Sequence, residues 1–102
     1  ILVIEVQPPE CDAWNFQLNN FWMESLDYRY YNICINKQGA HYEPDGTVRI
    51  AVSHENPGLP NWIETADHLE GTMCWRWYRI QQGSQAIQPS CRIVKKNELS
   101  QL

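Results

Sequence analysis

Apolar and polar residues alternate with a period of two along most of this chain. Trp14–Leu18 alternates large apolar residues with amides, and Thr72–Ile80 keeps a similar alternation. Because successive side chains of a strand point to opposite faces of a sheet, this period predicts two strands with one face in the core. A cysteine and a tyrosine on the second face of Thr72–Ile80 indicate that both of its faces are partly covered.

Shorter segments show the same strand character. They are Ile1–Val6, Tyr31–Asn36 and Ser90–Lys95. The first is closed by Pro8-Pro9, which cannot continue into a helix or a central strand. A β-hairpin is predicted where Ala40–Glu43 and Thr47–Ser53 flank Pro44-Asp45-Gly46, since proline fixes φ at one turn position and glycine accepts a positive φ at another.

The segments between these strands carry loop signals. The aromatic residues of Asn20–Tyr31 keep neither period for long, so we expect an irregular connection with one turn of helix. Glu55–Pro60 and the polar segment Gln81–Pro89 predict surface loops. The last residues, Asn97–Leu102, are expected to fray.

Short strands separated by turn signals, without a convincing amphipathic helix, predict an all-β fold. An antiparallel β-sandwich or barrel fits best, because a parallel sheet would need crossover helices for which the chain has no room. About a hundred residues form one domain. Residues 1–102 are therefore expected to be a single domain with an aromatic-rich core.

Charge and apolar content exclude several classes of partner. The net charge is −4 and the eight Lys and Arg residues are scattered, whereas nucleic-acid binding needs clustered basic residues. No apolar run approaches the roughly 18 residues that span a bilayer, and no signal segment begins the chain. We expect a soluble domain, with the cytoplasm favoured. The start at Ile1 without methionine suggests an excised domain or a processed product, and upstream sequence is expected to be missing.

Four cysteines, Cys11, Cys34, Cys74 and Cys91, are widely spaced. No Cys-x-x-Cys and no histidine pair at ligand spacing accompanies them, which argues against a zinc site. Three disulfide pairings are open for a secreted protein, whereas free thiols are favoured in a cytosolic one. We prefer free thiols, and no metal or other cofactor is predicted.

The order of motifs resembles the bacterial domain-of-unknown-function 1214 family. The resemblance covers roughly Ile4 to Val94 and rests on Trp14-Asn15-Phe16-Gln17-Leu18, Ser25-Leu26-Asp27-Tyr28, Asp45-Gly46-Thr47-Val48-Arg49-Ile50, Asn56-Pro57-Gly58, Asn61-Trp62 and Trp75-Arg76-Trp77-Tyr78. It implies a jelly-roll β-sandwich that forms the C-terminal domain of a longer chain, with no established activity, cofactor or catalytic residue.

One residue departs from the pattern of that family. The stretch Pro60–His68 resembles a subgroup in which glycine usually stands at the position of Asp67. If the glycine serves a positive φ, Asp67 must adopt that conformation at some cost, although aspartate tolerates it better than most residues.

Asp67 and His68 are weak candidates for acid–base catalysis, because a carboxylate can orient an imidazole and raise its pKa. Neighbours in an extended segment point apart, so the partner of His68 would be distant, with His54 and Glu24 as candidates. A structural, hydrogen-bonding role is favoured for His68 and also for His54. A metal site built from these histidines with Asp27 or Glu64 is not favoured, since no local ligand spacing supports it.

Arg76 lies within a predicted strand, where a partly buried guanidinium needs a carboxylate or carbonyl partner. We expect an ion pair with Asp27 or Glu24, which would tie Phe21–Tyr31 to the sheet. The alternative is that Arg76 binds an anionic ligand.

The aromatic residues fall into two groups. Trp14, Phe16, Trp75 and Trp77 are expected in the core. Trp22, Trp62, Tyr28 and Tyr30 lie in loop-like segments, where they could stack on a sugar or line an apolar pocket, or simply pack beneath a loop. The amides of Asn15, Asn19 and Asn20 would add hydrogen bonds nearby.

These observations favour a non-catalytic binding or interaction domain of a larger bacterial protein. The predicted ligand site, for a small molecule or carbohydrate, comprises Trp22, Tyr28, Trp62, His68 and Arg76. One alternative is a metal-independent hydrolase or isomerase that uses His68 with a carboxylate. Another is a structural domain that covers a partner domain, either the missing N-terminal part or a second copy in a homo-oligomer.

Overall fold

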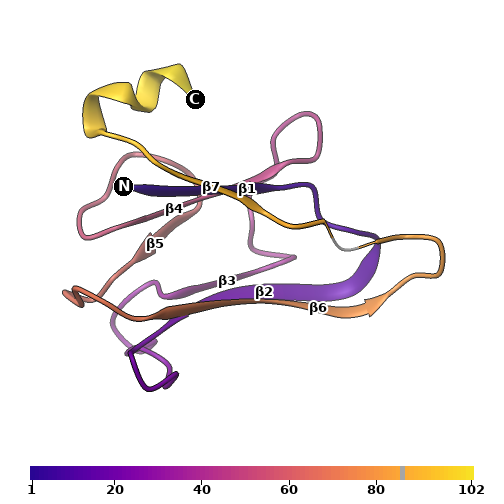
Figure 1. Ribbon diagram of the computed structural model, residues 1–102, viewed down its shortest axis with the longest axis horizontal. Coiled ribbons are helices and arrows are strands. Elements are labelled where there is room, and N and C mark those ends of the chain that lie inside the picture. Colours follow the sequence, from indigo (N-terminus) through magenta and orange to yellow (C-terminus); the bar gives the residue numbers. More distant parts are fainter. Residues whose placement is uncertain (86) are drawn as a thin grey trace.

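The strands form two sheets arranged in two layers (Figure 1). The computed structural model describes residues 1–85 and 87–102, so Ala86, within the predicted loop Gln81–Pro89, lies outside the described residues. The elements are β1 (Leu2–Val6), β2 (Cys11–Asn19), β3 (Cys34–Asn36), β4 (Val48–Ser53), β5 (Trp62–Glu64), β6 (Thr72–Ile80), β7 (Ser90–Ile93) and the 3-10 helix η1 (Lys96–Gln101). The strand-rich architecture with little helix confirms the predicted all-β class.

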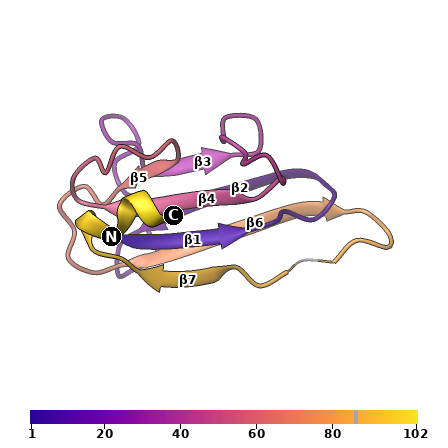
Figure 2. The ribbon, with the colours of Figure 1, turned by 90° about the horizontal axis from the view of Figure 1, so that it is seen from above.

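The strand orders are β5-β4-β1-β7 in one sheet and β3-β2-β6 in the other. The strands of both sheets run roughly along the same axis when viewed from above (Figure 2). β2 and β6 form the longest pairing, from Cys11 opposite Ile80 to Asn19 opposite Thr72. All pairings except that of β4 with β5 are antiparallel among the described strands.

The core lies between the two sheets. Trp14, Phe16 and Leu18 of β2 are buried in it, as their alternation predicts, and they share one apolar cluster with Ile4 of β1 and Ile50 of β4. Burial of large apolar side chains is the main favourable term in folding. The period of two in β2 therefore fixes which of its faces points inward.

Trp75 and Trp77 of β6 pack against this core but stay partly exposed. Their ring centroids lie 5.3 and 6.1 Å from that of Trp14, within the range of favourable aromatic contacts. The opposite face of β6 carries Arg76 and Tyr78, both of which are exposed. The expectation that both faces of this strand are covered is therefore wrong over its second half.

The predicted β-hairpin is not formed. Its turn exists, since the Glu43 amide donates to the Thr47 carbonyl oxygen at 2.8 Å and Gly46 has a φ of 90°. Ala40–Glu43, however, is not a strand, and β4 pairs with β1 and β5 instead. The reason is that the backbone N–H and C=O of His41 both bond to the Asn61 side chain, not to a neighbouring strand.

β4 and β5 run parallel, which corrects the expectation of a wholly antiparallel fold. The pairing covers only Ala51–Ser53 against Trp62–Glu64. Between the end of β4 and the start of β5 the chain must return by the length of the three paired residues, about 10 Å. The predicted loop Glu55–Pro60 suffices for that distance, so no crossover helix is needed, and β5 itself is a strand that sequence reasoning missed.

Asn61 is the buried polar residue that fixes this pairing. It is 3% exposed. Its Oδ1 accepts from the His41 amide at 2.8 Å, and its Nδ2 donates to the carbonyl oxygens of His41 and Arg49 at 2.8 and 2.9 Å. Its own carbonyl oxygen accepts from the Ala51 amide at 3.0 Å. One side chain thus joins the chain before β4, β4 itself and the start of β5.

Other boundaries differ from the sequence-based prediction. β3 begins at Cys34 and not at Tyr31, because the backbone of Asn32 bonds to Glu64 of β5 and leaves the β2–β3 ladder. The connection Asn20–Tyr31 consists of turns and one isolated bridge, without the expected turn of helix. The terminal residues expected to fray form η1. Within the described residues no helix is both long enough and apolar enough to cross a membrane.

Replacing Asn61 is expected to destabilise the fold strongly. Asn61→Ala leaves buried backbone groups without a partner, and we expect the free energy of unfolding to fall by about 3 kcal/mol. Asn61→Asp should also be destabilising, since a carboxylate would face two carbonyl oxygens. Urea unfolding followed by tryptophan fluorescence measures both. The exposed Asn97→Ala is the control, for which we expect less than about 0.5 kcal/mol; equal effects at the two positions would contradict the role of Asn61.

Candidate functional site

The five residues of the predicted ligand site do not converge. Trp22 and Tyr28 lie in the β2–β3 connection, Trp62 on β5, His68 in the β5–β6 connection and Arg76 on β6. The two hollows that His68 lines contain none of the other four residues. Trp62 is half-buried, with its Nε1 donating to the Ser53 carbonyl oxygen at 3.3 Å. The single pocket expected from the sequence is therefore not assembled.

The β2–β3 connection begins with a tight turn organised by Asn20. The Oδ1 of Asn20 accepts from the amides of Trp22 and Glu24 at 2.9 and 3.0 Å, and its Nδ2 donates to Glu24 Oε1 at 3.1 Å. Side-chain amides that bond the following backbone in this way stabilise turns. Met23 takes a positive φ of 63° within this turn. The hydrogen bonds of the Asn20 side chain therefore hold the backbone of the residues that follow it in one conformation.

Large apolar side chains gather on this connection and face solvent. We call it the aromatic loop, residues 20–31. Its most exposed apolar side chains are Phe21 at 62%, Trp22 at 74%, Met23 at 73%, Tyr28 at 72% and Tyr30 at 77%. Phe21 and Trp22 form an edge-to-face pair with centroids 5.0 Å apart. The loop leaves the β3-β2-β6 sheet at the end opposite the β6–β7 connection (Figure 1).

The aromatic loop is anchored at several points. Leu26 and Ile33 are buried in the core. Arg29 pairs with Asp27, with Nε 3.1 Å from Oδ1 and Nη2 3.3 Å from Oδ2, and its guanidinium lies over the Tyr30 ring. Just past the loop, the Asn32 amide donates to Glu64 Oε2 at 2.8 Å, which ties the loop to β5 of the other sheet. The Arg29 side chain lowers the pKa of the Asp27 carboxyl below its usual 3.8.

Sequence reasoning missed Phe21 and Met23 as site residues, although it selected Trp22 and Tyr28 from the same irregular segment. A usable signal was Asn20 directly before the apolar run Phe21-Trp22-Met23, since asparagine bonded to the backbone two residues on is a turn former. Because turns lie at the protein surface, apolar residues within such a turn are expected to be exposed.

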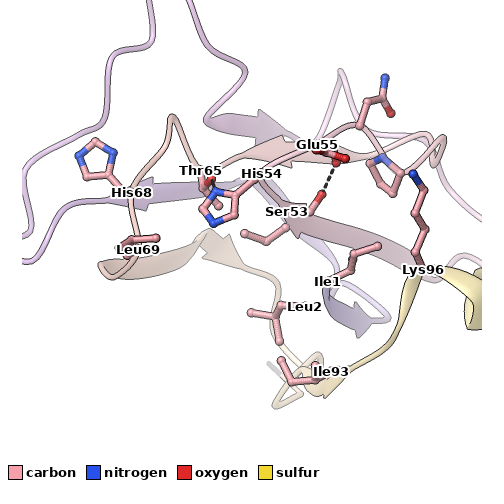
Figure 3. Close-up of a pocket in the computed structure, with 13 residues that line it drawn as sticks. Ile1, Leu2, Ser53, His54, Glu55, Thr65, His68, Leu69, Ile93 and Lys96 are labelled. Carbon is pink, nitrogen blue, oxygen red and sulfur yellow. Dashed lines mark hydrogen bonds between the residues drawn. The ribbon is translucent and has the colours of Figure 1, made fainter.

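A second candidate is a hollow of ≈ 560 Å³ beside the end of β4 (Figure 3). Ile1, Leu2 and Ile93 form an apolar wall, and His54, Thr65 and His68 supply polar groups. His54 Nδ1 is hydrogen-bonded to Thr65 Oγ1, which matches the structural role expected for this histidine. His68 lies on the loop beyond Thr65, apart from the His54 ring (Figure 3).

His68 does not form the acid–base pair considered from the sequence. Its Nδ1 lies 2.9 Å from the Ala66 carbonyl oxygen, and its backbone amide donates to Thr65. Within residues 1–85 and 87–102, no ion pair joins it to a carboxylate. Neither Glu24 nor His54 is its partner. Its observed contacts are those of a residue that closes a turn.

The same turn contains two residues with left-handed backbone. Asp67 has a φ of 62° and Ala66 a φ of 49°. Asp67 therefore adopts the positive φ anticipated for a position where glycine is usual. The turn ends at Gly71, where an added Cβ would collide with the Asn19 carbonyl oxygen. The conformation of the backbone at Ala66, Asp67 and Gly71 therefore explains more about the residues of this turn than a role in binding or catalysis does.

Arg76 lacks the predicted ion pair. Asp27 pairs with Arg29, and Glu24 accepts from Asn20. Arg76 Nη1 instead donates to Asn15 Oδ1 at 3.2 Å across the β2–β6 pair. Among the described residues, the other arginines each pair with a carboxylate. They are Arg29, Arg49, Arg79 and Arg92. Arg76 thus keeps an uncompensated charge on the exposed face of β6.

No group of three or more metal-binding side chains forms within the part of the chain that the structure describes. The four cysteines are free thiols, which agrees with the preference drawn from the sequence. Cys11 is buried, whereas Cys34 and Cys91 are exposed.

Neither family models nor curated proteins give a match to this chain. A solved structure does match: the crystal structure of an uncharacterised protein from Burkholderia cenocepacia, with 49% sequence identity and a TM-score of 0.85. The match covers 94% of this chain but only 26% of that protein. The chain is therefore similar to part of a much longer protein, and the resemblance to the domain-of-unknown-function 1214 family stays a prediction.

Glycine substitutions in the Ala66–Asp67 turn are expected to stabilise the protein. A left-handed conformation costs an L-residue about 1–2 kcal/mol, and aspartate tolerates it better than alanine. Ala66→Gly should therefore raise the free energy of unfolding by about 1 kcal/mol, and Asp67→Gly by less. Ala13→Gly, in an extended strand, is the control and should lower it. Chemical unfolding gives all three values, and a loss of stability in Ala66→Gly would rule out backbone strain at this turn.

The Asp27 carboxyl is expected to titrate below its usual pKa of 3.8. Because the folded-state pKa is lowered, the Asp27–Arg29 contact stabilises the protein above the unfolded pKa and is lost as pH falls through the folded one. Arg29→Gln should return the pKa of Asp27 towards 3.8, as measured by carboxyl-carbon NMR. Asp45 is the control, since the Thr47 backbone amide lowers its pKa and that cause is unaffected by Arg29.

Proposed function

We propose that this chain is a non-catalytic interaction domain of a larger bacterial protein and that the aromatic loop makes the contact. We also propose that it is a jelly-roll β-sandwich of the domain-of-unknown-function 1214 family. The observation that carries the proposal is the cluster of exposed apolar side chains on a loop whose backbone is fixed by Asn20 and by the tie between Asn32 and Glu64.

The composition of the aromatic loop is that of a protein interface. Trp, Tyr, Phe, Met and Arg are enriched in interface cores, whereas Lys is depleted. The loop contains Phe21, Trp22, Met23, Tyr28 and Arg29 and has no lysine. Contiguous exposed apolar groups on soluble proteins mark interaction sites. A rigid loop also loses little conformational entropy on binding, which favours affinity.

The proposed occupant is the rest of the same polypeptide. The matched structure is an uncharacterised protein of which this chain covers 26%, so a natural parent chain of several times this length is the simplest source of a partner surface. Exposed aromatic residues of one domain are then buried against its neighbour. This occupant replaces the sugar or small molecule considered from the sequence, because the predicted ligand residues do not share a pocket.

The enzyme alternative has less support. A general base must lie within hydrogen-bond reach of the proton that it takes, and its pKa is usually tuned by a neighbouring charge. His68 contacts a backbone carbonyl oxygen in a turn. Self-association through the aromatic loop is the remaining alternative, and the experiment below separates it from contact with the parent chain.

Trp22→Ala is expected to act differently in the parent protein and in the isolated domain. In the full-length protein, loss of a central interface tryptophan should cost about 2 kcal/mol of stability. In the isolated 102-residue domain, where Trp22 is 74% exposed, the cost should stay within about 0.5 kcal/mol. Thermal and chemical unfolding of both forms measure the difference.

Ile87→Ala is the matched control, because Ile87 is also apolar and 58% exposed but belongs to the β6–β7 connection. That connection leaves the sheets at the end opposite the aromatic loop (Figure 1). This substitution should change the stability of neither the full-length protein nor the isolated domain. Hydroxyl-radical oxidation of Met23 should also be lower in the full-length protein than in the isolated domain. Equal oxidation in both forms would refute the proposal. Concentration-dependent dimers of the isolated domain, abolished by Trp22→Ala, would establish self-association instead.

A further inference from the structure

The outer face of the β3-β2-β6 sheet is rich in amide side chains. In the register of this sheet, Asn15 of β2 lies opposite Asn36 of β3 and Arg76 of β6, so the three form one row across the face. Gln17 lies between Cys34 and Cys74 in the next row. Residues directly opposite in neighbouring strands share a face. We call these two rows the amide face; the strands that carry it form the lower layer in Figure 1.

The amide face is hollowed at its β3 side. A depression of ≈ 430 Å³ is lined by Asn15, Gln17, Asn32, Cys34, Asn36 and Gly39, among others. This volume is within the range of sites for small ligands. Its lining is unusual, because amide groups take the place of the apolar side chains that line most pockets. Such groups suit a ligand that offers many hydroxyl groups.

The amides have hydrogen-bonding capacity to spare. Gln17 Nε2 donates to Asn19 Oδ1 at 2.8 Å, and Asn36 Oδ1 accepts from the Gly39 amide at 2.7 Å. Each amide carries two donor hydrogens and an acceptor oxygen. Within residues 1–85 and 87–102, Gln17 Oε1 and Asn36 Nδ2 form no side-chain bond. One acceptor and one donor without a side-chain bond therefore flank Asn15, the first on the same strand and the second on the neighbouring strand.

Arg76 adds a positive charge to this neutral surface. A guanidinium has five N–H donors arranged as a fork that matches a carboxylate. Within the described part of the chain, the Arg76 side chain forms one hydrogen bond, from Nη1 to Asn15 Oδ1 at 3.2 Å, and no carboxylate pairs with it. Arg76 does not itself line the depression, but it bonds to Asn15, which does. In a chain with a net charge of −4, an unpaired arginine at this place is complementary to an anion.

We propose that the amide face binds an acidic saccharide, with its carboxylate on Arg76 and its hydroxyl groups on Asn15, Gln17 and Asn36. Tyr78, whose hydroxyl lies 3.5 Å from Asn15 Nδ2, borders the site beyond Arg76 and supplies a half-exposed ring on which a sugar can pack. This site is separate from the aromatic loop, and it does not depend on the interaction function proposed for that loop.

The test uses two disaccharides that differ by a single carboxylate, cellobiouronic acid and cellobiose. Titration of the isotope-labelled 102-residue protein is followed by NMR. Cellobiouronic acid should shift the resonances of Asn15, Gln17, Asn36 and Arg76 and should bind at least about tenfold more tightly than cellobiose, since a charge-assisted pair contributes this much. Equal affinity for the two sugars, or shifts confined to other residues, overturns the proposal.

Variants separate the contribution of Arg76, which binds the carboxylate, from that of the amides, which bind the hydroxyl groups. Arg76→Gln should lower affinity for cellobiouronic acid about tenfold and leave that for cellobiose unchanged. Gln17→Leu should lower affinity for both sugars. Arg79→Gln is the control, because Arg79 lies on the same strand but pairs with Asp12, and it should change affinity less than twofold, within about 0.4 kcal/mol. Wild-type affinity in Arg76→Gln overturns the proposal.

Two further arms make the assignment specific. An acetylated glutamate dipeptide should bind more weakly than cellobiouronic acid, and equal or tighter binding of the peptide would replace the saccharide by an acidic peptide and overturn the proposal. Trp22→Ala should not change saccharide affinity. A loss of saccharide affinity in that variant would move the site to the aromatic loop and also overturn the assignment to the amide face.

Discussion

The arrangement of β4, β5 and the segment before β4 depends on the buried side chain of Asn61. A buried amide must satisfy its donors and acceptor, and Asn61 does so by binding the backbone of His41 and Arg49. These hydrogen bonds keep residues 40–43 from pairing with β4 as a strand, and they hold the start of β5 beside β4, to which β5 runs parallel. β5 in turn presents Glu64 to Asn32, which anchors the aromatic loop of the other sheet. The position of β5 therefore brings Glu64 to the loop of the other sheet.

The aromatic residues serve two opposite purposes. Those of β2 and β6 surround Trp14, which is 1% exposed, and they hold the layers together. Those of the aromatic loop remain in water, although several backbone amides of the loop are hydrogen-bonded. Rigid exposure of apolar surface carries a solvation cost. Burial of the loop against a partner surface, as we propose, would remove that cost.

The charged and polar residues revise the chemistry suggested by the sequence. Five residues were expected at one site, but they lie on separate surfaces, and His68 serves a turn. The most specific polar feature is Arg76, whose expected carboxylate partners are engaged by Arg29 and Asn20. A surface of amides with one unpaired guanidinium offers hydrogen-bond donors, acceptors and a positive charge, which suits recognition of a polar ligand.

The sequence alone determined the strands whose side chains alternate, because a period of two depends only on which residues prefer burial. It thereby predicted β2, β6 and the inward face of β2, and other strand-like runs predicted β1 and β7. The positive φ at Asp67 was anticipated from the resemblance of Pro60–His68 to a family pattern. It could not determine β5, the parallel pairing or the partner of Arg76. These depend on contacts between residues distant in the chain, such as Asn61 with His41 and Arg76 with Asn15. Only the tertiary structure decides which of several available partners a polar side chain takes.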